Sequence, residues 1–208
     1  MRTNALRAAP VLGAATLALA LGPPLRAQEL DVDSAAERVI RFTSRTQVDD
    51  FEGVTDRVDG YVLLDGTPLS ASTGGDDTKL YFEVDLASLD TGIGLRNRHM
   101  RDNYLEVEKY PYASFEGKIT SVEASPGGGG RVTASGTFTV HGVSREREIA
   151  CDVTPSGEGY HTRCAFTVLL SDHDIEIPKV MFLKLANEIQ VDVAFTVRPV
   201  GRDAGGNP

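Results

Sequence analysis

Four histidines and a cluster of arginines are the side chains of this 208-residue chain best suited to acid–base, metal or anion chemistry. No two of the histidines (His99, His141, His161 and His173) have the HExxH spacing of a helical zinc site or the alternate-residue spacing of one strand face. The sequence has no Gly-x-Ser-x-Gly elbow, and glycines 127–130 lack the Lys-Ser/Thr of a phosphate-binding loop. We therefore predict no metal, no cofactor and no enzyme activity.

The arginine cluster is unusual because the chain as a whole is acidic, with a net charge of −9. Arg96, Arg98, His99 and Arg101 suit an anionic head group, because guanidinium groups match phosphate oxygens, and His141 is a further candidate. The alternative is structural: the same residues cap a short helix and pair with neighbouring acids at the surface.

Cys151 and Cys164 are the two cysteines of the chain, and they flank a hairpin whose tip is residues 156–159. A two-residue turn at Gly157-Glu158 would place them directly opposite one another on antiparallel strands, at a spacing close to that of a disulfide. We predict a structural disulfide, with two free thiols as the alternative.

Alternation of apolar and polar residues with a period of two predicts an all-β fold. We expect about eight strands, at residues 39–44, 61–64, 79–89, 114–122, 131–140, 145–154, 159–170 and 188–197. Short helices are expected around residues 98–107 and 179–185. Many short strands separated by turn residues are typical of a sandwich or a barrel, and an eight-stranded barrel is just wide enough to be filled by side chains or to hold one small ligand.

One face of these strands is apolar and is predicted to point inward. If the barrel holds a ligand, we expect these residues to line the pore: Phe82, Val84, Leu86, Ile119, Phe138, Val140, Phe166, Val168, Val193 and Phe195. Each of them would serve equally well in a filled core.

The first 27 residues have the layout of a secretory signal peptide. Arg2 and Arg7 precede an apolar run of about 14 residues, too short to span a bilayer, and Ala27 offers a cleavage site. Cleavage removes three arginines and no acid, so the net charge falls from −9 to −12. Such a chain is expected to avoid nucleic acid and anionic membrane surfaces. We predict one periplasmic or secreted domain at residues 28–198, without stable membrane insertion, and a disordered tail at 199–208.

Three motifs in order give the chain a family resemblance. They are residues 89–115, reading LDTGIGLRNRHMR, YL and KYPYASF; residues 136–144, GTFTVHGVS; and residues 174–189, with DIEIP and NEI. Together they resemble the YceI-like family over roughly residues 39–197. The resemblance implies an eight-stranded antiparallel lipocalin-like barrel that binds a polyisoprenoid lipid in a long pore. Asn97 departs from the family pattern, which often has an acid there.

The leading hypothesis is therefore an exported carrier of a long-chain isoprenoid lipid, polyprenyl or quinone-like. A sealed-core stress-response or interaction module without cargo is the second hypothesis. An enzyme acting on a lipid or quinone is the third, and it requires Asp90, His99 or His141 in a shared cleft with a shifted pKa. A homodimer is left open.

Overall fold

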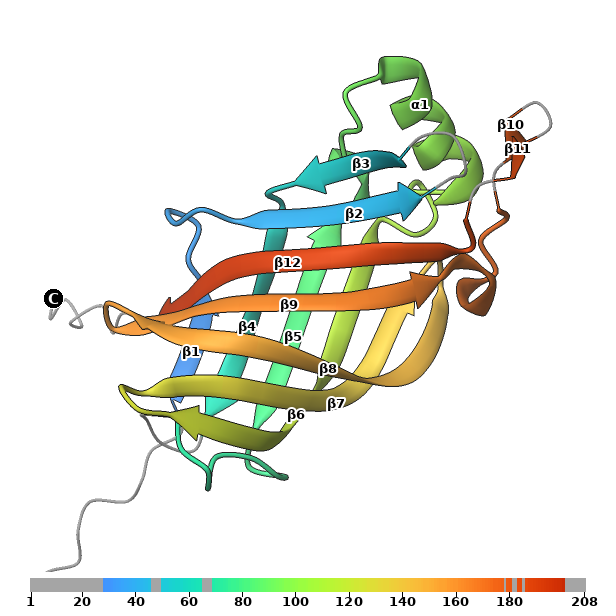
Figure 1. Cartoon of the computed structure of the whole chain (residues 1–208). Helices are drawn as coiled ribbons and strands as arrows, with labels where there is room; N and C mark the ends of the chain where they lie inside the picture. The colour runs from blue at the N-terminus through green and yellow to red at the C-terminus, as the bar shows by residue number, and fades with distance from the viewer. Residues whose placement is uncertain are drawn as a thin grey trace, which may run out of the picture.

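An antiparallel sheet that closes on itself forms the body of the protein (Figure 1). The computed structural model describes residues 28–45, 50–64, 69–177, 179–180, 183–184 and 186–200. The strands of the sheet are β1 (Gln28–Val32), β2 (Val39–Arg45), β3 (Asp50–Thr55), β4 (Val58–Leu64), β5 (Lys79–Asp85), β6 (Tyr112–Ser125), β7 (Gly129–Val140), β8 (Val143–Ser156), β9 (Gly159–Leu169) and β12 (Glu188–Pro199).

The sheet closes because β12 pairs with β9 on one side and with β1 and β2 in succession on the other. Val32 lies opposite Val197 and Val39 opposite Ala194, so β1 and β2 are two parts of one interrupted strand. In the same way, β3 and β4 lie in succession along β2 and β1. Counted as interrupted strands, the ten segments give eight, which confirms the predicted eight-stranded barrel.

Near β3 the ladder of the barrel is incomplete. β4 pairs with β5 along its length, but β3 has only an isolated bridge, between Val54 and Asp90, on its outer side. The segment after β5 occupies this position. It contains a short 3-10 turn (Leu86–Ser88), the helix α1 (Gly94–His99) and a π-helical turn (Met100–Tyr104). Leu86 therefore belongs to a turn rather than to the predicted strand 79–89.

Helix α1 with its π-helical extension confirms the first predicted helix, although it begins four residues earlier than expected. The second predicted helix, at 179–185, is wrong: β10 (Lys179–Val180) pairs with β11 (Leu183–Lys184) as a small hairpin. A seven-residue helix forms too few hydrogen bonds to be stable by itself, so local propensity does not decide the structure there.

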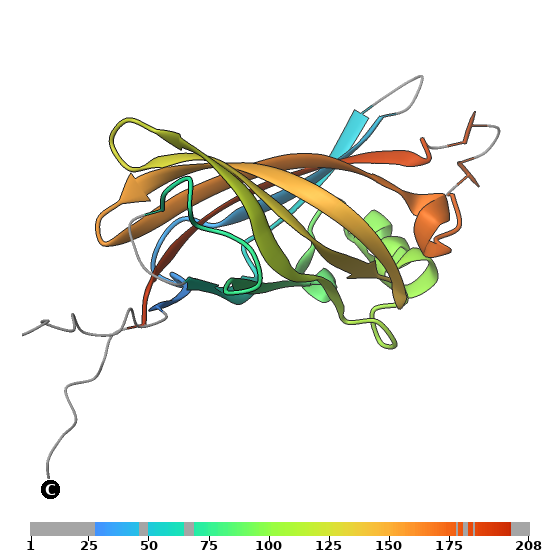
Figure 2. The ribbon, with the colours of Figure 1, turned by 90° about the horizontal axis from the view of Figure 1, so that it is seen from below.

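The two ends of the barrel are covered differently (Figure 2). Helix α1 and the 3-10 turn η3 (Leu170–His173) lie at one end, and the loop of residues 69–78 lies at the other. This loop is attached to β6, because Gly75 N–H donates to the Ile119 carbonyl and Ile119 N–H donates to the Thr78 hydroxyl.

The predicted signal peptide lies outside the described residues, as do residues 201–208 of the predicted tail. Pro199 pairs with Leu30, and Val200 N–H donates to the Glu29 carbonyl at 3.1 Å. These two residues belong to the barrel.

Candidate functional site

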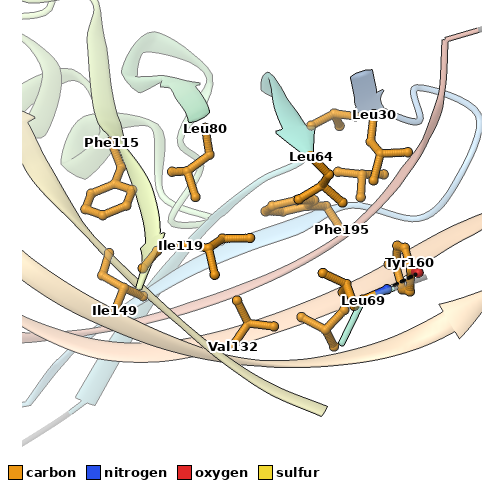
Figure 3. Close-up of a cluster of buried hydrophobic side chains, with 14 of the residues drawn as sticks. Leu30, Leu64, Leu69, Leu80, Phe115, Ile119, Val132, Ile149, Tyr160 and Phe195 are labelled. Carbon is orange, nitrogen blue, oxygen red and sulfur yellow. Dashed lines mark hydrogen bonds between the residues drawn. The ribbon is translucent and has the colours of Figure 1, made fainter. Parts of the chain in front are cut away.

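A cavity of about 990 Å³ runs through the inside of the barrel. Its volume lies at the upper end of the range for small-molecule sites, and its wall is almost entirely apolar. Figure 3 shows part of this wall, with Phe115, Ile119, Val132 and Ile149 directed toward the interior. The structure places all ten residues predicted to point inward on the wall, namely Phe82, Val84, Leu86, Ile119, Phe138, Val140, Phe166, Val168, Val193 and Phe195.

One end of the cavity is closed by fully buried side chains. Leu30 and Leu64 are each 1% exposed, and Leu69 from the covering loop packs beside them. Tyr160 lies on the same part of the wall, and its hydroxyl accepts a hydrogen bond from Leu69 N–H at 3.1 Å (Figure 3). This bond attaches the loop to β9, and the side chains that close this end are predominantly apolar.

The other end opens beside α1. Three residues of the wall are exposed, Ile93, Leu95 and His99, and all three belong to α1 or immediately precede it. The mouth of the cavity therefore lies where α1 replaces a β-ladder in the barrel wall.

Helix α1 is held in place by a polar network around Thr91. Asn97 Oδ1 accepts from Thr91 N–H at 2.8 Å and from the Thr91 hydroxyl at 2.6 Å, and Asn97 Nδ2 donates to Asp90 at 2.7 Å. Arg96 donates from Nε to the Thr91 hydroxyl at 2.9 Å and from Nη2 to the Thr91 carbonyl at 2.6 Å. Its guanidinium carbon lies 4.7 Å from the centre of the Phe51 ring.

The five predicted head-group residues do not gather in one place. Arg96 and His99 lie on the cavity wall, but Arg98 is exposed and lies off the wall. Arg101 donates to the Leu89 carbonyl at 2.7 Å. His141 lies in the β7–β8 turn, where its Nδ1 is 3.1 Å from the carbonyl of His173. Only two of the five therefore line the cavity.

Sequence reasoning missed one polar group at this end of the cavity. Ser44 is 1% exposed, lines the cavity, and its hydroxyl has no hydrogen-bond partner among the described residues. It lies opposite Phe51 on β3, which in turn contacts Arg96. Alternation along β2 could have predicted the inward direction of Ser44, because Ile40, Phe42 and Ser44 are spaced two residues apart and all three line the cavity.

A second break in the ladder lies between β8 and β9. These strands pair only from Cys151 to Ser156, although β8 begins at Val143 and β9 continues to Leu169. We call the unpaired part the β8–β9 seam. Arg147 lies across it and donates from Nη2 to the Thr167 carbonyl at 2.7 Å.

The guanidinium of Arg147 covers the cavity wall from the seam. Its central carbon lies 4.9 Å from the Phe166 ring centre and 5.6 Å from that of Phe138, both of which line the cavity. Burial lowers the pKa of Arg147, and nearby Asp172 partly offsets this effect. Beyond it, buried His173 closes the seam, with its Nδ1 2.9 Å from the Val143 carbonyl.

Comparison with known proteins identifies the family. The sequence pattern of the YceI-like domain matches residues 30–197, most of the chain. The protein belongs to the YceI-like family. UPF0312 protein VPA0850 of Vibrio parahaemolyticus is 28% identical to this YceI-like chain over 107 residues, covering 49% of the chain and 54% of the relative. This chain thus spans about half the length of that relative.

Solved structures show that this YceI-like domain shares its fold with several other bacterial proteins. BcnA of Burkholderia cenocepacia has a TM-score of 0.63 at 18% identity, covering 79% of this chain and 98% of BcnA. A polyisoprenoid-binding domain of Saccharophagus degradans has a TM-score of 0.62 at 17% identity, covering 84% and 100%. The YceI protein of Campylobacter jejuni has a TM-score of 0.56 at 15% identity, covering 92% and 100%.

The residues required by the enzyme hypothesis are dispersed in this YceI-like domain. His99 lines the cavity, but Asp90 and His141 do not. Hydrogen bonds from Asn97 and from Gly92 N–H lower the pKa of Asp90, so this carboxylate is stabilised in its charged form. Among the described residues, no group of three metal-binding side chains lies together, and no helix has the length and apolar character needed to cross a membrane.

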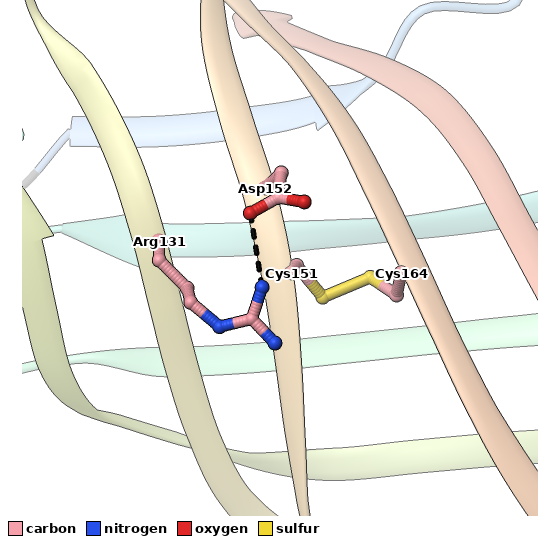
Figure 4. The surroundings of a disulfide bond; sticks show 4 residues. All are labelled: Arg131, Cys151, Asp152 and Cys164. Atoms are coloured by element: carbon pink, nitrogen blue, oxygen red, sulfur yellow. Dashed lines mark hydrogen bonds and ion pairs between the residues drawn. A yellow bond between two sulfur atoms is a disulfide. The ribbon is translucent and has the colours of Figure 1, made fainter. Parts of the chain in front are cut away.

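The predicted disulfide is present in the YceI-like domain. Cys151 and Cys164 are bonded directly across β8 and β9 (Figure 4), and Gly157 adopts the left-handed conformation, with φ of 60°, that the two-residue turn requires. Both cysteines line the cavity, and the outward-facing pair Arg131 and Asp152 lies beside them, with Nη1 and Oδ1 3.1 Å apart. The disulfide joins the last residue pair before the seam.

Proposed function

We propose that this YceI-like domain is a carrier that binds one long-chain isoprenoid lipid, polyprenyl or quinone-like, inside the barrel. The observation that carries the proposal is the apolar cavity of about 990 Å³, closed at the Tyr160 end and open beside α1. Each buried methylene contributes about 0.8 kcal/mol, so each five-carbon unit adds several kcal/mol before ordering costs. Such a ligand binds tightly through burial alone, without a catalytic group.

The distribution of polar groups supports one orientation of the lipid. Ser44, Arg96 and His99 lie toward the mouth, whereas the opposite end presents Leu30, Leu64 and Leu69. The head group is expected at the mouth, where it meets hydrogen-bond donors, and the tail is expected against the closed end. The ten inward residues named above form the proposed tail-binding surface.

Two further observations support the cargo and the compartment. The structural neighbour from Saccharophagus degradans is a polyisoprenoid-binding domain. The Cys151–Cys164 disulfide is typical of a protein that matures in an oxidising compartment, in agreement with the predicted signal peptide and a periplasmic or secreted location. The sealed-core alternative requires the inward side chains to meet at the barrel axis, and the cavity argues against it.

A blocking substitution tests the proposal. Ala134 is 7% exposed and lines the middle of the cavity between Ile119 and Ile149. Ala134→Phe should lower the amount of isoprenoid co-purifying with natively expressed protein at least tenfold, measured by mass spectrometry of an organic extract. Ala165→Phe makes the same change on the exposed face of β9 and should leave the lipid content unchanged.

Circular dichroism of both variants checks that the barrel has folded. Ala113→Phe provides a second block nearer α1, should Ala134→Phe be unstable. Equal lipid content in the blocked and control variants, or no isoprenoid in any of them, would contradict the proposal.

A further inference from the structure

The rim of the cavity mouth carries the two most exposed large apolar side chains of the described residues. Ile93 is 54% exposed and Leu95 is 60% exposed, and they are separated by a single glycine. Side chains on a barrel wall normally turn apolar atoms inward, yet these two both line the cavity and reach solvent. Adjacent exposed apolar residues at a binding-site entrance are typical of an interaction surface.

Cationic side chains surround this apolar pair. Between Asp90 and Asp102, which flank the segment, residues 91–101 contain three arginines and no acid, although the chain carries a net charge of −9. The side chains of Arg96 and Arg101 donate to carbonyl oxygens. The exposed side chain of Arg98 has no hydrogen bond or ion pair with the described residues. None of the three forms an ion pair with a described carboxylate. Arg96 is half-buried and the Nε of Arg101 is buried, so exposed Arg98 carries the positive charge that is most available at the surface.

We infer that this surface docks on a phospholipid bilayer. We call it the α1 rim and define it as Ile93, Leu95, Arg96, Arg98 and Arg101. The two apolar side chains enter the interfacial layer, and the arginines meet lipid phosphate oxygens, which are the anions that guanidinium groups match best. The inference rests on the proposed function in one respect: a carrier of a membrane lipid must contact the membrane to load its cargo.

The position of the rim explains how an apolar cargo would enter. Because Ile93 and Leu95 form part of both the rim and the cavity wall, docking would place the mouth against the lipid layer. An isoprenoid tail would then pass from bilayer to barrel without crossing water. Two apolar side chains give only weak attachment, which suits a carrier that must also leave the membrane.

Charge makes this docking directional. The excess of acids elsewhere on the molecule is repelled by phospholipid phosphates, as the net charge predicts. The expected avoidance of anionic membranes therefore applies to the rest of the surface, and the α1 rim is the face that approaches most readily. The attraction acts over a distance of about one Debye length, roughly 8 Å at physiological salt, so it depends on ionic strength.

Vesicle flotation tests the inference. The full-length mature protein is mixed with vesicles of phosphatidylcholine containing one part in three of phosphatidylglycerol, and with pure phosphatidylcholine vesicles as a reference. Leu95→Ser should weaken binding to the mixed vesicles about tenfold, because it removes about half of the newly buried apolar area. Arg98→Glu should weaken it about 25-fold, because the substitution changes the charge by two units and each unit near such a surface contributes about fivefold.

Matched control variants carry the same changes elsewhere. Val200→Ser alters a side chain that is 48% exposed at the opposite end of the barrel, and Arg163→Glu alters an exposed arginine on the outer face of β9. Both should bind mixed vesicles as the unmodified protein does. Binding should also fall as salt is raised.

Uptake of a prenyl lipid from detergent micelles separates this inference from the proposed function, because it needs no bilayer. Normal uptake by Arg98→Glu together with weakened vesicle binding supports docking. Normal uptake by the unmodified protein without vesicle binding overturns docking alone, and assigns the rim to a protein partner or to a second copy of the chain. Equal effects of rim and control substitutions overturn it as well.

Discussion

Removal of the Cys151–Cys164 disulfide should destabilise the barrel by an amount that the loop length sets. The two cysteines are 13 residues apart, so the crosslink restrains a short loop in the unfolded chain. In the chain-entropy model, a crosslink that closes such a loop raises the free energy of unfolding by about 3 kcal/mol. For a domain of this size about 1 kcal/mol shifts the melting temperature by about 2–4 °C, so we expect a fall of about 6–12 °C.

The position of the disulfide adds a second expectation. It joins the last pair of the β8–β9 ladder before the seam, so without it the strands are held by the backbone pairing from residues 151 and 164 to the hairpin tip and, across the seam, by the Arg147–Thr167 hydrogen bond. Strand separation that begins at the seam should then extend past Cys151 and Cys164, which both line the cavity. Hydrogen exchange of the amides at residues 152–156 should therefore accelerate in the reduced protein.

Thermal unfolding followed by circular dichroism provides the measurement. The unmodified protein is compared in oxidised and reduced form with the double variant Cys151→Ala, Cys164→Ala, on which reductant should have no effect. A fall below about 2 °C in both the reduced protein and the double variant would refute the reasoning, because neither the loop nor the seam would then depend on the crosslink.

Two further predictions concern the other side chains that close the seam. Arg147→Ala should lower the free energy of unfolding by about 1–2 kcal/mol. Because the substitution uncovers the Phe138 and Phe166 rings, it should also increase the fluorescence of an added apolar dye. Unchanged dye binding would contradict this role of Arg147. Burial lowers the pKa of His173 below its ordinary value of 6.5, so the unfolded chain takes up a proton first and stability should fall as the pH drops from about 6.5 through the lowered value. His173→Gln should flatten this part of the pH profile of the melting temperature, and an unaltered profile would exclude His173 as its source.

The barrel was predictable because its strands carry a strong alternation, and the two missed segments show where that signal weakens. β3 has Phe51, Gly53 and Thr55 on its inward face, so only one of the three is apolar. Gly53 is required by packing: a Cβ at this position would lie 2.1 Å from the Phe42 ring. The tight contact with Phe42 thus leaves this position without the apolar side chain that would mark the strand. β1 has only five residues and directly follows the predicted cleavage site, so its alternation is too short to predict a strand.

The residues of the cavity wall were predictable from the alternation of side chains along each strand, but the residues of the mouth were not. The period of two assigns Phe138 or Phe166 to the interior regardless of what the strand packs against. No such rule fixes Arg96, Arg98 and Arg101, because their directions depend on how α1 is held by Thr91 and on which carbonyls lie nearby. Arg147 lies two residues before inward-facing Ile149 on β8, so the alternation places it on the inward face. The sequence does not show, however, that β8 and β9 are unpaired at this position.

The two breaks in the ladder lead to different expectations for cargo exchange. At the β8–β9 seam, a guanidinium stacked on two rings and a buried histidine fill the space where hydrogen-bonded strands would lie. At the other break, β3 is joined to the segment after β5 by one bridge between Val54 and Asp90, by a hydrogen bond between the Thr55 and Ser88 hydroxyls and by the packing of Arg96 on Phe51. Local opening costs least where few backbone bonds must break and apolar surface is already exposed. A lipid should therefore enter and leave beside α1, with the seam held closed throughout.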